Sequence, residues 1–189
     1  MRVQLGWMVA VLATLLTMGT ARVGSEPGAW AQSKPPSPLL KEGETAPDFT
    51  LKTPQGKPLT LSVFARNRVV LLDFFFISSD FCRMQLPHLQ KAYEQFQAQG
   101  LTVLCVDIGR TDSPSDIQRY WEANKLTLPV VKNEAGSNDA SKAYRIVNCP
   151  TSYLVGKDRK VLARWVGFLA ANGPQRLKEQ LAKAGFKQP

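Results

Sequence analysis

The chain has 189 residues, of which 44% are hydrophobic and 21% charged, so it suffices for one folded domain with an apolar core. This composition excludes a disordered or collagen-like chain. The net charge is +9, but the basic residues are scattered along the chain, so no nucleic-acid partner is expected. The three cysteines, Cys82, Cys105 and Cys149, lack the paired spacing of a structural zinc site, and we expect neither a metal nor a cofactor.

The N-terminal segment predicts export. Arg2 precedes an apolar, uncharged run at residues 5–18, and the small residues Ala29 and Ala31 resemble a cleavage site. We expect a signal peptide at residues 1–31 and a periplasmic protein. An uncleaved membrane anchor stays open as an alternative, because the uncharged stretch between Arg2 and Arg22 approaches the roughly 20 residues that span a bilayer. Such an anchor would hold the domain close to the membrane, outside the cytoplasm.

The remaining chain divides into a linker and one domain. Residues 32–41 contain three prolines and form the predicted linker, and residues 42–189 form the domain. At its start, residues 49–51 and 59–62 predict a hairpin around a turn at 53–56. Residues 69–76 are apolar except for Asp73, which is typical of a buried central strand. An amphipathic helix follows, with capping residues at 78–80 and an end at Gly100.

Further elements alternate along the chain. We expect a strand at residues 101–108, a helix at 115–124, an extended segment at 128–131 and a short helix at 139–144. A hairpin of 151–155 and 160–166 and a helix at 174–184 follow, with Leu177, Leu181 and Ala184 on the core face of that helix. This order predicts an α/β fold with a mixed central sheet, helices on both faces and an N-terminal β-hairpin extension.

Three segments carry a family resemblance. Residues 70–87, VLLDFFFISSDFCRMQLP, resemble the strand, turn and helix of the thioredoxin superfamily, in which W-C-x-x-C is followed by a proline; Pro87 lies five residues after Cys82. Residues 46–51, APDFTL, resemble the opening of the exported TlpA/ResA-like and AhpC/TSA redoxins. Residues 144–155 resemble their segment around a cis-proline, here Pro150. The resemblance implies a thioredoxin fold and a thiol-disulfide oxidoreductase acting on protein thiols or disulfides.

The motif departs from the family at its first cysteine. With Cys82 aligned to the second cysteine, Ser79 occupies the position of the attacking one, giving SxxC in place of CxxC. A serine hydroxyl is essentially undissociated near neutral pH and forms no stable disulfide, so ordinary CxxC cycling is excluded. The resemblance assigns Cys82 the role of working thiol, Ser79 that of a capping hydroxyl beside it and Asp73 that of a proton-handling acid.

The segment around the cis-proline supplies the remaining candidates. Cys149 precedes Pro150, at a position that faces the redox turn in this fold, so it is a candidate disulfide partner of Cys82. Pro150, Asn148 and Phe81 are the candidate substrate-binding residues implied by the resemblance. Cys105 lies between Leu104 and Val106 within a predicted strand and is expected to pack in the core.

Two alternatives remain open from the sequence. One is a non-catalytic binding module that keeps the groove of the fold but has lost its chemistry. The other is a one-cysteine peroxidase acting on a small oxidant, because Ser79 and Cys82 fit the end of the peroxiredoxin pattern P-x-x-x-[TS]-x-x-C. Phe75 stands in place of the proline of that pattern, and no arginine is present at Asn148 or Cys149.

Overall fold

A computed structural model describes residues 39–134, 136, 139–168 and 171–187. The predicted signal peptide and residues 32–38 of the predicted linker lie outside these residues. Within the described part of the chain, no helix is both long and apolar enough to cross a bilayer.

One mixed β-sheet organises the domain. Its strands are β1 (Thr50–Lys52), β2 (Pro58–Thr60), β3 (Val69–Phe75), β4 (Leu101–Asp107), β5 (Val130–Lys132), β6 (Thr151–Val155) and β7 (Val161–Val166). They are arranged in the order β2-β1-β5-β4-β3-β6-β7. β3, β4 and β5 run parallel, whereas β1–β2, β1–β5, β3–β6 and β6–β7 are antiparallel pairs. The predicted mixed sheet with an N-terminal hairpin extension is confirmed.

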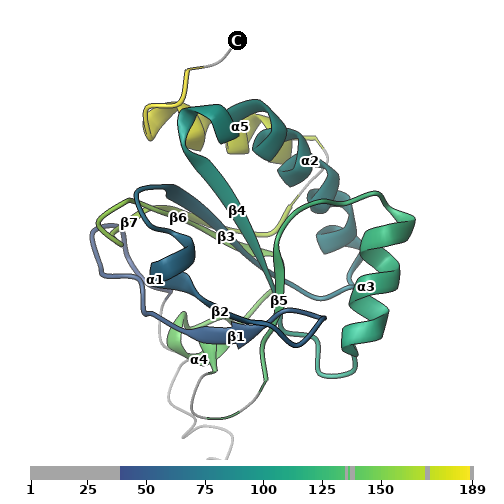
Figure 1. Cartoon of the computed structure of the whole chain (residues 1–189). Helices are drawn as coiled ribbons and strands as arrows, with labels where there is room; N and C mark the ends of the chain where they lie inside the picture. The colour runs from purple at the N-terminus through teal and green to yellow at the C-terminus, as the bar shows by residue number, and fades with distance from the viewer. Residues whose placement is uncertain (1–38, 135, 137–138, 169–170, 188–189) are drawn as a thin grey trace, which may run out of the picture. The chain divides into compact units, whose positions relative to one another are not determined.

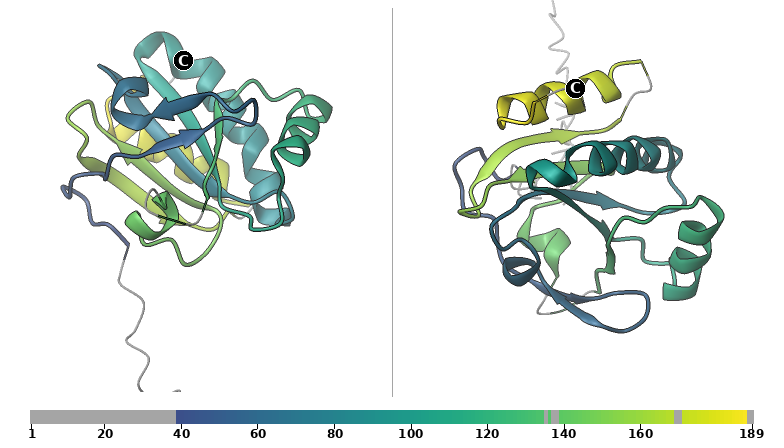
Figure 2. Two further views of the ribbon diagram at one scale, coloured as in Figure 1. Left: turned by 60° about the horizontal axis from the view of Figure 1, so that its bottom comes forward. Right: turned by 45° about the horizontal axis from the view of Figure 1, so that its top comes forward.

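Helices cover both faces of the sheet (Figures 1 and 2). They are α1 (Leu61–Phe64), α2 (Asp80–Phe96), α3 (Pro114–Ala123), α4 (Ala140–Ala143) and α5 (Gly173–Lys183). Buried residues of α2, α3 and α5 belong to one hydrophobic cluster, and those of α1 and α4 belong to another. The sheet therefore separates two cores, as alternation of side chains along its strands requires.

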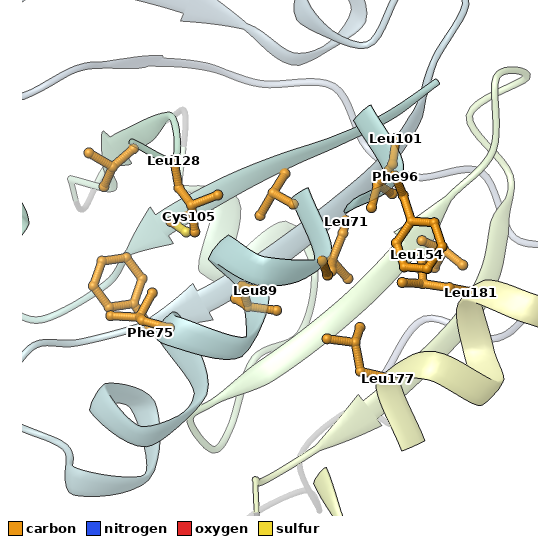
Figure 3. Packing of buried hydrophobic residues seen from close by; sticks show 14 of the residues in the cluster. Leu71, Phe75, Leu89, Phe96, Leu101, Cys105, Leu128, Leu154, Leu177 and Leu181 are labelled. Carbon is orange, nitrogen blue, oxygen red and sulfur yellow. The ribbon is translucent and has the colours of Figure 1, made fainter. Parts of the chain in front are cut away.

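The larger core lies between the sheet and helices α2, α3 and α5. From β3 it receives Leu71 and Phe75, and Figure 3 shows them near Leu89 of α2 and Cys105 of β4. Cys105 is fully buried in this cluster, which confirms its predicted core position. Since side chains alternate along a strand, Asp73 projects toward the same face as Leu71 and Phe75.

Element boundaries differ from the prediction mainly at the N-terminal hairpin. The strand predicted over 59–62 ends at Thr60, and the short helix α1 begins at Leu61. Two hydrogen bonds turn the chain there: Leu61 N donates to Phe49 O (3.0 Å), and Ser62 N donates to Asp48 Oδ1 (2.9 Å). The helix that was predicted to end at Gly100 is α2. Its α-helical part ends at Phe96, and a 3₁₀ turn follows over Gln97–Gln99. Gly100 ends it in the left-handed conformation (φ 95°), which glycine adopts without steric cost.

The first part of the domain also reaches the opposite edge of the sheet. Gly43 N donates to Val161 O (2.8 Å), and Val161 N donates to Glu44 O (3.0 Å). Ala46 N donates to Arg159 O (2.8 Å). Residues 43–46 therefore pair with the start of β7, the outermost strand.

Candidate active site

The loop between β3 and α2 places the first candidate residues. Ser79 is the N-cap of α2, and its side chain accepts a hydrogen bond from Cys82 N (3.4 Å). This bond satisfies one of the N–H groups left free at the start of a helix. Cys82 lies in the first turn of α2 with no exposed surface, whereas Ser79 is partly exposed.

A second loop brings Cys149 to the same place. The peptide bond between Cys149 and Pro150 is cis, and Thr151 Oγ1 donates to Asn148 O (2.6 Å). β6 begins at Thr151, which pairs with Phe74 near the end of β3, so the residues before β6 lie beside the loop that follows β3. The Cys149 thiol is hydrogen-bonded to Cys82, and both cysteines are free thiols.

This contact separates the acidities of the two thiols. The hydrogen bond from Cys149 lowers the pKa of Cys82 from 9.0 to about 7, with further lowering from the Ser79 hydroxyl and a backbone hydrogen bond at Phe76. Burial opposes this effect. The pKa of Cys149 is raised, first by its hydrogen bond to Cys82 and then by burial. The pair therefore holds one thiolate near neutral pH, stabilised on Cys82.

Asp73 belongs to a buried polar cluster near Cys82. Its Oδ1 accepts hydrogen bonds from Ser152 Oγ (2.7 Å) and from Gln85 Nε2. Burial raises the pKa of Asp73 well above its ordinary value, hydrogen bonds from Ser152 and Gln85 oppose the rise, and the charge of Cys82 adds to it. Asp73 Oδ2 and Gln85 Oε1 are buried acceptors without a donor among the described residues. The raised pKa favours the protonated form of the Asp73 carboxyl, which makes it a candidate proton-handling group near Cys82.

A second acidic cluster contacts the loop before α2, and the sequence did not reveal it. Asp112 Oδ2 accepts a hydrogen bond from Ile77 N (2.9 Å), which fixes the loop before α2. Asp112 also contacts Asp107, whose Oδ1 accepts from Lys132 Nζ (2.6 Å). Burial raises the pKa of Asp107 to about 7; Lys132 opposes this rise, and Asp112 adds to it. A Cβ at Gly109 would overlap the Asp112 carboxylate, so this arrangement requires glycine.

Of the three candidate substrate-binding residues, only Asn148 lines the pocket beside Cys149. A pocket of about 510 Å³ is lined by ten residues, Phe76, Ser78, Ile108, Gly109, Arg110, Thr111, Ile146, Val147, Asn148 and Cys149. Pro150 is buried and Asn148 is exposed. Phe81 does not line this pocket, but half of its surface is exposed on the first turn of α2, beside Cys82 in sequence.

Comparison with known proteins agrees with this geometry. The profile of the AhpC/TSA family matches residues 43–164, which is more than half of the chain. The chain belongs to the AhpC/TSA family. The predicted redoxin relationship and thioredoxin fold are thereby confirmed.

Several proteins similar to this AhpC/TSA chain are named as thiol-disulfide oxidoreductases or thiol:disulfide interchange proteins. "Thiol-disulfide oxidoreductase ResA" of Bacillus thuringiensis subsp. konkukian is 27% identical over 142 residues, covering 75% of each chain. "Sporulation thiol-disulfide oxidoreductase A" of Bacillus subtilis is 25% identical and covers 89% of this chain and 94% of the relative. A crystal structure described as a putative thiol:disulfide interchange protein DsbE from Chlorobium tepidum superposes with a TM-score of 0.68. That structure is 28% identical, and the match covers 77% of this chain and 99% of the other.

Proposed function

We propose that this protein is an exported thiol-disulfide oxidoreductase whose redox pair is Cys82 and Cys149. The observation that carries the proposal is that the two thiols, from the start of α2 and the loop before β6, lie close enough for each to shift the pKa of the other. Sulfurs in such contact need little movement to form a disulfide, provided that the geometry of the bond can be reached. The relatives named as thiol-disulfide oxidoreductases support the same chemistry.

Within this proposal, the loop before Pro150 replaces the missing half of a CxxC motif. Ser79 stands three residues before Cys82 and is an alcohol, which forms no stable disulfide. It serves instead as helix cap and as hydrogen-bond partner of the Cys82 sulfur. Asp73 exchanges a proton with the cysteine pair when the pair is oxidised or reduced.

Proteins with thiols or disulfides are the proposed substrates. Asn148 lines the pocket at Cys149, and the exposed side chains of Phe81 and Val147, close in sequence to Cys82 and Cys149, supply apolar surface. A polypeptide docked along the loop before Pro150 would bring its own sulfur to this pocket.

Export is the second part of the proposal. Its basis is the apolar segment at 5–18 and the small residues that end at Ala31. We expect the mature chain to begin at Gln32. Mass spectrometry of the protein expressed in a bacterium with a periplasm tests this, and a full-length mass in the membrane fraction would favour the anchor instead.

Peptide mapping tests the redox pair. The purified full chain is oxidised with glutathione disulfide, alkylated and digested without reductant. We expect one linked peptide joining the segments of Cys82 and Cys149, with Cys105 alkylated only after unfolding. Cys105→Ala is the matched control and should give the same linked peptide.

Three free thiols after oxidation of a folded protein would contradict the proposed redox pair. Peroxide consumption without the linked peptide would favour a one-cysteine peroxidase. The absence of both activities would favour a binding module.

A further inference from the structure

The two cysteines differ in their access to solvent. Cys82 has no exposed surface, since the first turn of α2 lies against the large core. Cys149 is partly exposed and lines the pocket of about 510 Å³ together with Ser78, Arg110 and Asn148. A sulfur on another protein can therefore reach Cys149 from outside but meets Cys82 only through Cys149.

We propose that the mixed disulfide with a substrate forms on Cys149, in the loop before Pro150, and that Cys82 is the buried sulfur that leaves and returns. This inference rests on the proposed redox pair. It assigns the substrate-facing role to the loop, whereas the sequence motif assigned the working thiol to the helix.

The oxidative direction proceeds in two exchanges. A substrate thiolate attacks Cys149 Sγ of the protein disulfide; a new bond forms between the two sulfurs, and the bond to Cys82 breaks. The electron pair of that bond leaves with Cys82, which becomes a thiolate. A second substrate thiolate then attacks the substrate sulfur and releases Cys149. Two substrate thiols become a disulfide, the protein disulfide becomes two thiols, and the two protons pass to the released sulfurs or to water.

The electrostatics of the site suit Cys82 to the leaving role. A thiol with a lower pKa is displaced faster from a disulfide. Once released, the Cys82 sulfur is stabilised by the Ser79 hydroxyl and by a backbone hydrogen bond at Phe76, and the start of α2 favours a negative charge. The Cys149 thiol adds its own hydrogen bond after the second exchange has freed it. Asp73 and Asp112 act in the opposite sense through their negative charge when ionised.

The reverse direction uses the same roles. Cys149 first passes its proton to the Cys82 thiolate, with which it shares a hydrogen bond, and then attacks the substrate disulfide as the thiolate. The first substrate sulfur departs and takes up the proton that Cys82 gives back. The Cys82 thiolate next attacks Cys149 Sγ, which closes the protein disulfide and releases the second substrate sulfur. By microscopic reversibility, Cys82 closes the bond that it opens in the oxidative direction.

Single-cysteine variants test the assignment. Full-length Cys82→Ser and Cys149→Ser are incubated with glutathione disulfide at mildly alkaline pH, and the mixed disulfide is followed by intact mass. We expect Cys82→Ser to acquire glutathione on Cys149. We expect folded Cys149→Ser to react at least about tenfold more slowly, because the thiolate must be accessible to attack a disulfide. The same variant unfolded in guanidinium should react readily.

A second measurement avoids dependence on the folding of either variant. The oxidised wild-type protein is mixed with reduced glutathione, quenched with acid and mapped, and we expect the adduct on Cys149. An adduct on Cys82, or equal reactivity of the two folded variants, would overturn the assignment while leaving the redox pair intact. If wild-type protein instead forms no disulfide between Cys82 and Cys149, the proposed function itself fails.

Discussion

The acidity of Cys82 should depend on Cys149 more than on any other residue. The pKa of Cys82 is lowered from 9.0 to about 7, and the hydrogen bond from Cys149 is the largest cause. Two pKa units correspond to about 3 kcal/mol of preference for the thiolate. In Cys149→Ala this donor is lost while burial remains, so the pKa of Cys82 should rise toward its ordinary value of 9.0. At pH 7, the thiolate fraction of Cys82 should then fall from about one half to about one hundredth.

Titration of the thiolate absorbance in the far ultraviolet measures this change. Cys105 does not interfere, because burial raises the pKa of its thiol well above the ordinary value. Cys149→Ser is the matched control: its hydroxyl keeps a donor at the same position, so the pKa of Cys82 should stay closer to 7. An unchanged pKa of Cys82 in Cys149→Ala would refute the reasoning. The low pKa would then be due to the Ser79 hydroxyl and the N-terminal end of α2.

Three further predictions concern the acids around the pair. Asp73→Asn should raise the free energy of unfolding at neutral and alkaline pH, because it removes a buried acid whose pKa is raised, and it should slow disulfide exchange measured by stopped flow. Asp107 holds its proton up to about pH 7 when folded but only to about 4 when unfolded, so its contribution to stability is lost as the pH rises between these values. In urea titrations, Asp107→Asn should reduce the fall in unfolding free energy over that range by a few kcal/mol; an unaltered pH profile would contradict this. Gly109→Ala should lower the melting temperature, because its methyl group displaces Asp112 from Ile77 N; a native melting temperature would show that the loop absorbs the change.

Hydrophobic pattern was sufficient to predict the sheet but not every turn. The apolar runs of β3 and β4 are buried along their whole length, as their sequences indicate. The helix α1 was missed because Leu61 and Ser62 continue the alternation of a strand. The chain turns there because Ser62 N donates a hydrogen bond to the Asp48 carboxylate, 14 residues earlier in the sequence. A contact of that kind has no local signature.

The cysteine site was more predictable than its surroundings. The position of Cys149 before Pro150 indicated a residue that faces Cys82, and the structure brings the two thiols into contact. The cluster of Asp107, Asp112 and Lys132 was missed because its members come from two strands and a loop, without a recurring spacing. The only signal in the sequence was an aspartate at the end of a buried apolar run, which marks the end of β4 as polar.

The pairing of residues 43–46 with β7 also protects the sheet from other chains. An exposed edge strand offers unpaired N–H and C=O groups to any extended polypeptide. At one edge, β2 has three residues and begins with Pro58, so it offers a poor template. At the other edge, Gly43 and Glu44 already form hydrogen bonds with the backbone N–H and C=O of Val161. Arg164 adds a charge to the rest of β7. If partly folded proteins are the substrates, they can approach the pocket at Cys149 without readily pairing with an edge strand of the sheet, which limits aggregation.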